Sequence, residues 1–512
     1  MINKKRFFFN GILLTAVGIA MRTVALLFNA FITRTVGAEG VGLYTVVMTV
    51  YSFAVTFATS GISLTVTRLV ASAKGEGKED EVPKILAGAV LYALAFALIA
   101  TFVLFFGSTL FADRVLGDIR AAVPLRILAP SLIPLTLVSV FSGYFVGIRK
   151  VAFNAVTQIF GQVFRICATV WLVIHSSSLG VEGAARAMSI GTTATEIICF
   201  AVIFVQFLME RRGQSRERGA RVGAVAGVAI PLAVSAYIRQ ALLTVEHILI
   251  PKRLRARGNS VSESLSAYGI LHGMALPMIL YPMATLSSFS GLLVPEFAEK
   301  SAEGDKPAMS RLASRAFGTT LIYAVSTAVL LFMFSEELGY VIYKSSSAGQ
   351  YIAVLSFIVP IMYLDHVTDS VLKGIGEQVY SMWVNITDSF LSIVFVWFLI
   401  PKMGIMGYAV CIIVMEGYNF VLSAIRLFSK IRFRISLTRC IVYPAVSAFI
   451  SAWLTVHLFI SAGEMTSTLW LVLEIVFAVC VIVAVYRILL LIEDMFLHRF
   501  RPRKYTKSDK CA

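Results

Sequence analysis

Long apolar segments dominate this chain and leave little of it free to form anything else. Hydrophobic residues occupy 58% of the 512 positions and charged residues only 14%, with a mean hydropathy of +0.83. A helix needs roughly 20 apolar residues to cross a bilayer, and the hydropathy pattern supports about fourteen such segments joined by short polar turns. We therefore predict an all-α integral membrane protein with little chain left for a soluble domain.

The predicted spans form two groups of six, followed by a final pair. They lie at residues 8–33, 41–69, 84–106, 123–147, 154–174, 183–209, 222–250, 265–294, 312–334, 350–372, 379–400, 404–428, 437–460 and 465–490.

An internal echo indicates two lobes. Residues 42–44 (Gly-Leu-Tyr) begin an apolar stretch that ends in a charged, glycine-containing loop at 73–78. A second apolar stretch begins at 267–269 and ends in a similar loop at 302–306. Two six-span lobes in parallel orientation would explain this repeat, and a substrate site would then lie between them; chance similarity of two membrane hairpins is the alternative. The predicted divisions are an N-terminal lobe at 1–221, a C-terminal lobe at 222–434, two additional helices at 435–490 and a basic cytoplasmic tail at 491–512.

The distribution of positive charge predicts an orientation. The chain carries a formal net charge of +16, and with both termini cytoplasmic most lysines and arginines fall on the inner side, as the positive-inside rule requires. We expect these residues to meet anionic membrane lipids, not nucleic acid. The basic segment 251–257 breaks the rule on the predicted outer side, so either the span count is wrong nearby or the segment has a role of its own.

Three arginines lie inside predicted spans: Arg22, Arg165 and Arg239. A charged residue at that depth costs roughly 2.5 to 3.5 kcal/mol on insertion scales, and it normally faces the bundle interior or a wet cavity. A cavity with positive walls suggests an anionic cargo. The alternative is that the arginines pair with carboxylates within the spans, and the candidates for such pairing or for ion coupling are Glu196, Asp388 and Glu416.

Other motifs narrow the chemistry. The sequence contains no nucleotide-binding phosphate loop, zinc helix or nucleophile elbow, so we predict neither an enzyme nor a cofactor or metal. None of the six cysteines forms a CxxC pair.

Asn29 follows Arg22 at i+7 and would share its helix face. Because a guanidinium binds phosphate oxygens as a fork, a pyrophosphate headgroup would suit these arginines.

Two runs carry a family resemblance. Residues 34–44 (RTVGAEGVGLY) and 268–277 (YGILHGMALP) resemble the stage V sporulation protein B group of polysaccharide exporters, in the superfamily that contains lipid II flippases and multidrug and toxin extrusion transporters. The resemblance implies fourteen spans, alternating access and transfer of a lipid-linked sugar between leaflets. It places Arg22 at a cavity arginine of lipid II flippases, puts His272 where those flippases have a second one, and assigns the last two spans to a groove for the lipid tail.

The resemblance and the buried cations together favour one function. We expect a flippase in a bacterial plasma membrane that moves a lipid-linked oligosaccharide or peptidoglycan precursor and draws its energy from the membrane potential or an ion gradient. The headgroup would be bound by Arg22, Asn29, Arg165, Arg239 and His272. Envelope-synthesis enzymes are possible partners. Two other functions stay open: a multidrug cation antiporter of the same fold, which would want acids in its cavity, and a non-transporting scaffold for envelope assembly.

Overall fold

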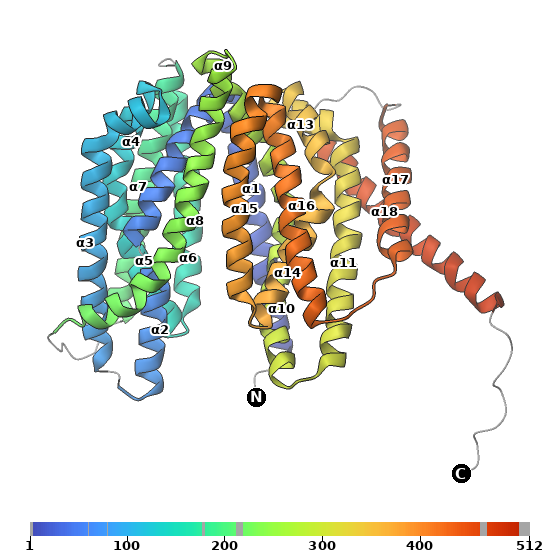
Figure 1. Cartoon of the computed structure of the whole chain (residues 1–512), viewed down its shortest axis with the longest axis horizontal. Coiled ribbons are helices and arrows are strands. Elements are labelled where there is room, and N and C mark those ends of the chain that lie inside the picture. Colours follow the sequence, from blue (N-terminus) through green and yellow to red (C-terminus); the bar gives the residue numbers. More distant parts are fainter. Residues whose placement is uncertain are drawn as a thin grey trace, which may run out of the picture. The chain divides into compact units, whose positions relative to one another are not determined.

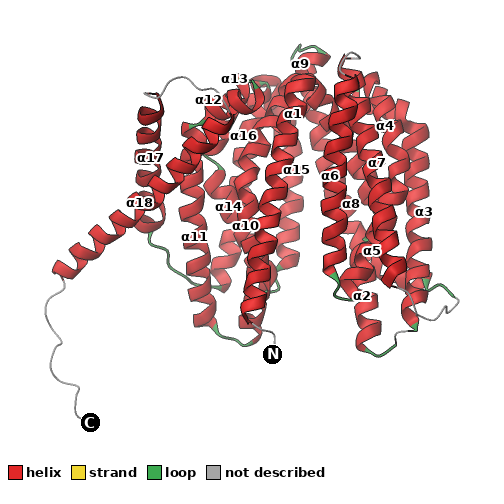
Figure 2. Cartoon of the chain, turned by 180° about the vertical axis from the view of Figure 1, so that it is seen from behind, coloured by secondary structure: helices red, strands yellow, loops and turns green. Residues whose placement is uncertain are grey.

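The computed structural model of the chain describes residues 4–59, 61–78, 80–176, 180–210, 219–460 and 468–500. Within these ranges every regular element is a helix (Figure 1 and Figure 2). The predicted all-α membrane fold is confirmed. The basic loop at 211–218 and the end of the predicted basic tail, from 501 onward, lie outside the described residues.

The α-helices follow one another with short connections. They are α1 (Lys4–Thr59), α2 (Ile62–Gly75), α3 (Glu81–Leu110), α4 (Ala122–Leu128), α5 (Leu132–Gly147), α6 (Val151–Ser176), α7 (Gly180–Glu210), α8 (Val222–Ala256), α9 (Val261–Tyr268), α10 (Leu276–Ala302), α11 (Lys306–Met333), α12 (Ser335–Glu337), α13 (Ser346–Ser356), α14 (Val359–Gly374), α15 (Gln378–Met403), α16 (Ile405–Lys430), α17 (Tyr443–Ile460) and α18 (Thr468–Phe500). Two short segments of the described chain are 3-10 helices, η2 (Ile119–Ala121) and η3 (Ala129–Ser131). Four are π-helices: η1 (Phe111–Leu116), η5 (Gly269–Ala275), η6 (Leu338–Ile342) and η7 (Thr438–Val442).

Each predicted span corresponds to a helical segment of the structure, although not always to one separate helix. By length and composition, 12 described helices can cross a membrane, or 13 if the bent pair Ser346–Ser356 and Val359–Gly374 is one span with a 58° bend. The bent pair corresponds to the predicted span 350–372. The candidate Met21–Gly75 is 55 residues long, far more than the roughly 20 that one crossing needs. It accounts for the first two predicted spans together.

A glycine separates those two spans inside α1. Gly37 has φ 78° and ψ 172°, which interrupts the helical backbone between the predicted segments 8–33 and 41–69. A side chain is strained at such a positive φ, whereas glycine adopts it readily. Gly37 therefore allows one continuous stretch of chain to supply two crossings.

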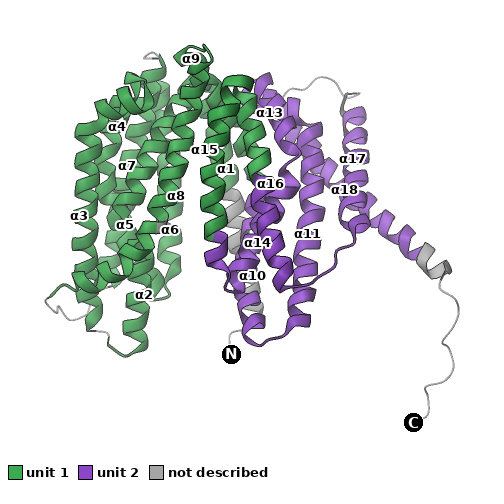
Figure 3. Cartoon of the chain, in the orientation of Figure 1, with its two compact units in different colours: residues 1–281, 382–415 green, residues 282–381, 416–512 purple. Residues whose placement is uncertain are grey.

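The chain divides into two compact units, coloured separately in Figure 3. Unit 1 comprises Met1–Tyr281 and Met382–Met415, and unit 2 comprises Pro282–Ser381 and Glu416–Ala512. Helices α10, α15 and α16 contribute to both units. The lobes predicted from the internal repeat have other boundaries and stay a prediction.

Unit 1 has an aromatic core formed by α2, α3, α5, α7 and α8. Tyr144 and Phe145 on α5 are 1% and 0% exposed, and they pack with apolar residues of the neighbouring helices. The ring of Phe207 on α7 lies 5.5 Å from that of Tyr144 in an edge-on arrangement. This core fixes the helices that support the site described next.

Helices α6 and α7 pack closely because small residues line their contact. A Cβ on Gly161 would overlap the Sγ atom of Cys199, and a Cβ on Gly191 would overlap the side chain of Thr169. Without a hydrophobic force between helices in lipid, small residues that let backbones approach are a main source of helix association. The close contact holds the polar faces of both helices in fixed positions.

Candidate functional site

Two adjoining pockets lie in the membrane-spanning part of unit 1. They share Ala25 and Arg165 and have volumes of about 560 and 400 Å³. The first, the arginine pocket, is lined by Met21, Arg22, Ala25, Ala155, Gln158, Ile159, Gly161, Gln162, Arg165, Thr195, Glu196 and Cys199. The second, the histidine pocket, is lined by Ala25, Phe28, Asn29, Ile32, Val41, Tyr44, Thr45, Met48, Arg165, Thr169, Met188, Thr192, His272 and Gly273.

The arginine pocket brings together two of the predicted cations. Arg22 comes from α1 and Arg165 from α6. Neither makes an ion pair within 4.0 Å among the described residues. Arg165 donates through Nη2 to Oε1 of Gln162 at 2.7 Å, whereas its Nε is buried without a hydrogen-bond partner. Both guanidinium groups are therefore available to an anion that enters the pocket.

Glu196 of α7 lines the same pocket as Arg165. The two side chains interact electrostatically, but no nitrogen–oxygen distance of 4.0 Å or less joins them in the described structure. The ion pair that the sequence left open as an alternative is not formed here. A carboxylate and two guanidinium groups instead share one pocket.

Uncharged polar residues complete the arginine pocket, and the sequence reasoning missed them. Gln158 and Gln162 precede Arg165 on α6, and all three line the pocket. Thr169 continues the row into the histidine pocket. The spacing i, i+4, i+7 and i+11 places these residues on one helix face. That spacing was the available signal.

Asn29, which was predicted to share a helix face with Arg22, lines the histidine pocket, whereas Arg22 lines only the adjoining arginine pocket. Its Oδ1 accepts a hydrogen bond from Thr33 Oγ1 at 3.2 Å. Across the pocket, the hydroxyl groups of Tyr44 and Thr192 are hydrogen-bonded at 2.9 Å. The pocket therefore presents an amide and hydroxyl groups next to Arg165.

His272 reaches the histidine pocket from η5, which packs very tightly against α1. A Cβ on Gly42 would overlap the backbone oxygen of Leu265, and a Cβ on Gly269 would overlap that of Ala38. These two glycines let the backbones of α1 and of the α9–η5 segment touch. The contact fixes His272 at the pocket wall.

A second histidine supports His272. The imidazole rings of His247 and His272 are stacked with centroids 4.6 Å apart. The hydroxyl group of Tyr268 is hydrogen-bonded to Nδ1 of His247 at 3.0 Å, whereas Nδ1 of His272 is buried with no partner among the described residues. The sequence reasoning selected His272 and missed His247, which lies on another helix.

The remaining predicted residues lie elsewhere. Asp388 on α15 interacts electrostatically with Arg239 and with Glu246 of α8, and Glu246 accepts a hydrogen bond from Ser392 Oγ at 2.6 Å. Glu246 is only 8% exposed, and Oδ1 of Asp388 has no hydrogen-bond partner in the part of the chain that the structure describes. Arg239 is exposed and is not among the residues lining either pocket. Glu416 is half-buried on α16 in unit 2.

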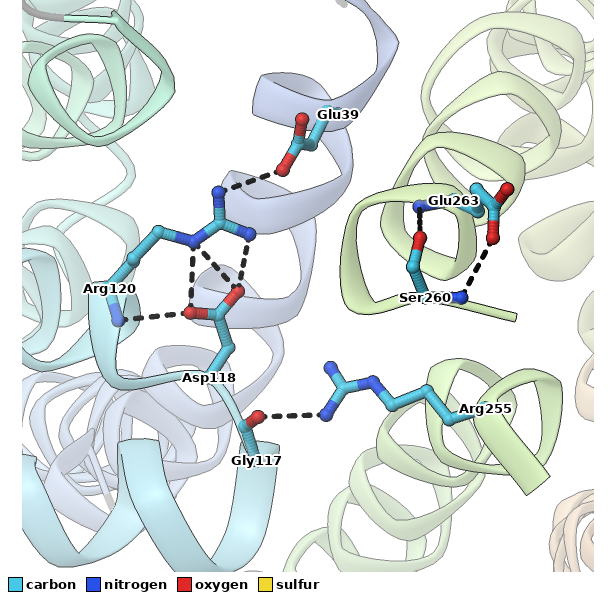
Figure 4. A network of polar contacts seen from close by, with 7 residues as sticks. All are labelled: Glu39, Gly117, Asp118, Arg120, Arg255, Ser260 and Glu263. Carbon is cyan, nitrogen blue, oxygen red and sulfur yellow. Dashed lines mark hydrogen bonds and ion pairs between the residues drawn. The ribbon is translucent and has the colours of Figure 1, made fainter. Parts of the chain in front are cut away.

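The basic segment 251–257 forms the end of α8, and its side chains bind backbone carbonyl groups. Lys252 Nζ donates to the carbonyl of Arg114 at 3.1 Å. Figure 4 shows the bond from Arg255 Nη1 to the carbonyl of Gly117, which is 2.8 Å long. Arg253 stacks on Trp397 at 4.0 Å and donates to its carbonyl at 3.2 Å. Carbonyl groups near helix C-termini carry partial negative charge, so they attract these cations.

A neighbouring network fixes the loop that receives Arg255. Arg120 donates to both carboxylate oxygens of Asp118 and, through Nη1, to Glu39 at 2.8 Å (Figure 4). Asp118 is 8% exposed and also accepts a bond from the backbone nitrogen of Arg120. The same view shows the capping box of Ser260 and Glu263 at the start of α9. The end of α8 is thus surrounded by ordered polar contacts.

Comparison with known proteins connects these pockets to a family. A model described as polysaccharide biosynthesis protein matches residues 8–301, more than half of the chain. The chain belongs to the polysaccharide biosynthesis protein family. A second model, MatE, matches residues 258–398 of this family member. The predicted membership of the superfamily that contains flippases and multidrug transporters is confirmed.

Relatives and solved structures agree with this assignment. The family member is 26% identical to stage V sporulation protein B of Bacillus subtilis (strain 168), over 80% of this chain and 81% of the relative. It is 21% identical to lipid II flippase MurJ of the same organism, over 68% and 69% of the two chains. A structure of lipid II flippase MurJ in an inward closed conformation has a TM-score of 0.72 at 14% identity, covering 93% of this chain and 98% of that one.

A multidrug resistance MATE family transporter in an inward-facing conformation shares the same fold. Its TM-score is 0.63 at 13% identity, and the match covers 80% of this chain and 95% of that one. The family member is therefore a multi-pass protein of a bacterial membrane. Its relatives are transport proteins, which confirms the prediction that it is not an enzyme.

Proposed function

We propose that the protein moves a lipid-linked saccharide with a pyrophosphate headgroup from the inner to the outer leaflet of a bacterial plasma membrane. The observation that carries this proposal is that Arg22 and Arg165 line one pocket at membrane depth, neither with a carboxylate within ion-pair distance among the described residues. Two guanidinium groups and one carboxylate leave a net positive charge in the pocket, and such charge at this depth is expensive. An anionic cargo that offsets the charge is the simplest reason to keep it.

Different pocket residues would bind different parts of the headgroup. Arg22 and Arg165 would hold phosphate oxygens, because a guanidinium donates two parallel hydrogen bonds to them. Asn29 and His272 would donate further hydrogen bonds from the histidine pocket. Arg239, exposed on α8 and outside both pockets, would meet the headgroup only during entry or exit.

The polyprenyl tail would stay in the lipid while the headgroup crosses, and the two lobes would alternate in access. Relatives named lipid II flippase and stage V sporulation protein B support a cargo for the cell envelope, and we propose a peptidoglycan-type precursor first. Both termini would be cytoplasmic, as the positive-inside rule predicts.

Energy would come from the membrane potential or an ion gradient. Each charge moved through 100 mV is worth about 2.3 kcal/mol. We propose Asp388 with its neighbour Glu246 as the principal coupling carboxylates, because Glu246 is buried, Asp388 is half-buried beside it, and Oδ1 of Asp388 has no hydrogen-bond partner among the described residues. Glu196 and Glu416 are further candidates for coupling.

The test is reconstitution into vesicles with a labelled polyprenyl-pyrophosphoryl saccharide and measurement of its exposure on the opposite leaflet, with and without an imposed potential. We expect acceleration by the unmodified protein and a loss of at least tenfold for Arg22→Ala and Arg165→Ala. Arg186→Ala is the matched control, because Arg186 pairs with Glu182 on an exposed helix surface and lines neither pocket. No acceleration with any such lipid would overturn the proposal.

Glu196 and the MatE match favour one alternative, a multidrug cation antiporter. Two arginines in the same pocket would repel an organic cation, so we rank this function second. Efflux of a cationic dye from the same vesicles, abolished by Glu196→Gln, would support it. A scaffold role instead predicts that cells tolerate Arg22→Ala when the variant protein still folds and inserts.

A further inference from the structure

The arginine pocket contains hydrogen-bonding groups that the described structure leaves unused. Gln158 lines the pocket, is exposed, and makes no hydrogen bond to another described residue, so its carboxamide is accessible to a ligand. The carboxylate of Glu196 accepts none there, and Nε of Arg165 is buried without a partner. A buried polar group is normally satisfied, so Nε of Arg165 calls for a ligand or bound solvent, and the accessible side chains of Gln158 and Glu196 can meet the same ligand.

We propose that Gln158 and Gln162 of α6, together with Glu196 of α7, bind the sugar next to the pyrophosphate through its hydroxyl groups and thereby determine which saccharide is accepted. This inference rests on the proposed flippase function and names the residues of the pocket that would recognise the sugar.

The residue types match a sugar better than they match more phosphate. A carboxamide offers donors and an acceptor, and a carboxylate offers two acceptors, so together they complement hydroxyl groups that both donate and accept. Glu196 would repel a phosphate placed beside it, whereas it would attract a neutral group with hydroxyl donors. The two arginines in the same pocket disfavour a cation. In a headgroup with an anionic part and a neutral polyhydroxyl part, the anion pairs with the arginines and the hydroxyl groups donate to the carboxylate of Glu196.

The pocket has a suitable size and a rigid wall. Its volume of about 560 Å³ lies within the range of about 300 to 1,000 Å³ for small-molecule sites. Close packing at Gly161 and Cys199 holds α6 against α7, so the two helix faces keep their spacing.

Gln162 has a double role. Its Oε1 accepts the 2.7 Å bond from Arg165, so it also positions the guanidinium between the phosphate and sugar ends.

Specificity follows from the same geometry. A site built to hydrogen-bond a hydroxyl group rejects an analogue without it, because the polar groups of the site then stay unpaired. Gln158 is the cleanest probe, because its carboxamide supports no other described contact. Glu196→Gln keeps the size of the side chain and removes the charge.

The experiment measures equilibrium binding of the full-length protein in nanodiscs to three fluorescent lipids. These are polyprenyl pyrophosphate, the same lipid carrying one hexose, and the same lipid carrying the corresponding dideoxyhexose. For the unmodified protein we expect the hexose lipid to bind roughly tenfold more tightly than the other two. Gln158→Ala should reduce that preference by roughly twofold to tenfold, as expected for the loss of one net hydrogen bond, and should leave the affinity for polyprenyl pyrophosphate unchanged.

Glu196→Gln should also reduce the preference, without weakening the binding of polyprenyl pyrophosphate, because removal of the negative charge cannot disfavour phosphate. Gln350→Ala is the matched control, since Gln350 is exposed at the start of α13 and lines neither pocket. Its sugar preference should equal that of the unmodified protein. Elution volume and melting temperature establish that each variant is folded.

The outcomes separate the inference from the function on which it rests. Equal affinity of the unmodified protein for all three lipids would overturn the sugar site and leave the flippase proposal standing. The same holds if Gln158→Ala and Glu196→Gln keep the full preference, or lose affinity equally for every lipid. Failure of the unmodified protein to bind any of the three lipids would count against the proposed function itself.

Discussion

The imidazole rings of His247 and His272 stack with centroids 4.6 Å apart and an interplanar angle of 6°. His247 comes from α8, His272 from η5, and only His272 lines the histidine pocket. The stack therefore links the wall of a candidate binding pocket to a second helix. The two rings have different positions: His272 lines the pocket, and His247 stacks on it from α8.

Replacing His272 tests these contributions separately. His272→Phe preserves an aromatic stack and removes the hydrogen-bonding nitrogens, so its melting temperature should stay near that of the unmodified protein. Binding of polyprenyl pyrophosphate should weaken by roughly twofold to tenfold. His272→Ala also loses the stack, which is worth about 1 kcal/mol beyond area burial, and its melting temperature should fall. Unchanged lipid binding by both variants would show that His272 is structural only.

The glycine contact between α1 and η5 predicts a large effect of a small change. Gly269→Ala would place a Cβ against the backbone oxygen of Ala38, and forcing an atom into a packed contact costs about 1 to 3 kcal/mol. We expect a lower melting temperature and weaker lipid binding, because η5 carries His272.

Gly227→Ala is the control for Gly269→Ala. A Cβ at Gly227, inside α8, meets nothing within 4 Å, and alanine in a helix is favoured over glycine by about 0.5 to 1 kcal/mol. Its melting temperature should rise slightly. A tolerated Gly269→Ala would contradict the close approach.

The spans could be predicted from the sequence because hydropathy is a local property, and the break at Gly37 falls between two predicted segments. Charged candidates such as Arg22 and Arg165 were also found, since charge inside an apolar segment is conspicuous. Gln158 was missed because it is uncharged, although its spacing from Arg165 marks a shared helix face. Which carboxylate approaches which arginine depends on helix rotation and packing, so the missing ion pair of Glu196 could not be read from the chain.

Arg120 should be more important for stability than an exposed arginine. It bonds both carboxylate oxygens of Asp118, which is 8% exposed, and it also reaches Glu39. Arg120→Ala would leave the carboxylate of Asp118 without its charged donor and cost about 2 kcal/mol. Arg186→Ala breaks only an exposed pair with Glu182 and should cost less than about 0.5 kcal/mol. Equal shifts in melting temperature would contradict this ranking.

The basic end of α8 should restrain the loop after η1. Arg255 and Lys252 bond the carbonyl groups of Gly117 and Arg114, so the double variant Lys252→Ala/Arg255→Ala should increase hydrogen exchange in residues 114–121. Arg257→Ala is the control, because Nη1 of Arg257 lies beside Gly404 instead. If exchange in 114–121 is equal in both variants, the bonds do not restrain the loop.

Glu377 predicts a local dependence of stability on pH in unit 2. It lies between α14 and α15 and pairs with Lys430 at 2.7 Å and with Arg426 at 2.8 Å, and these cations lower the pKa of its carboxyl group below the usual 4.5. A lowered pKa in the folded state stabilises the protein above the unfolded pKa, and this contribution is lost as the pH falls through the folded value. The unmodified protein should therefore melt at a higher temperature than Glu377→Gln at pH 7, by a small margin because the cations are exposed. That margin should shrink as the pH falls below the unfolded pKa and vanish once the pH is below the lowered pKa of the folded state. A margin that grows on acidification would show that Glu377 is not held ionised by its two partners.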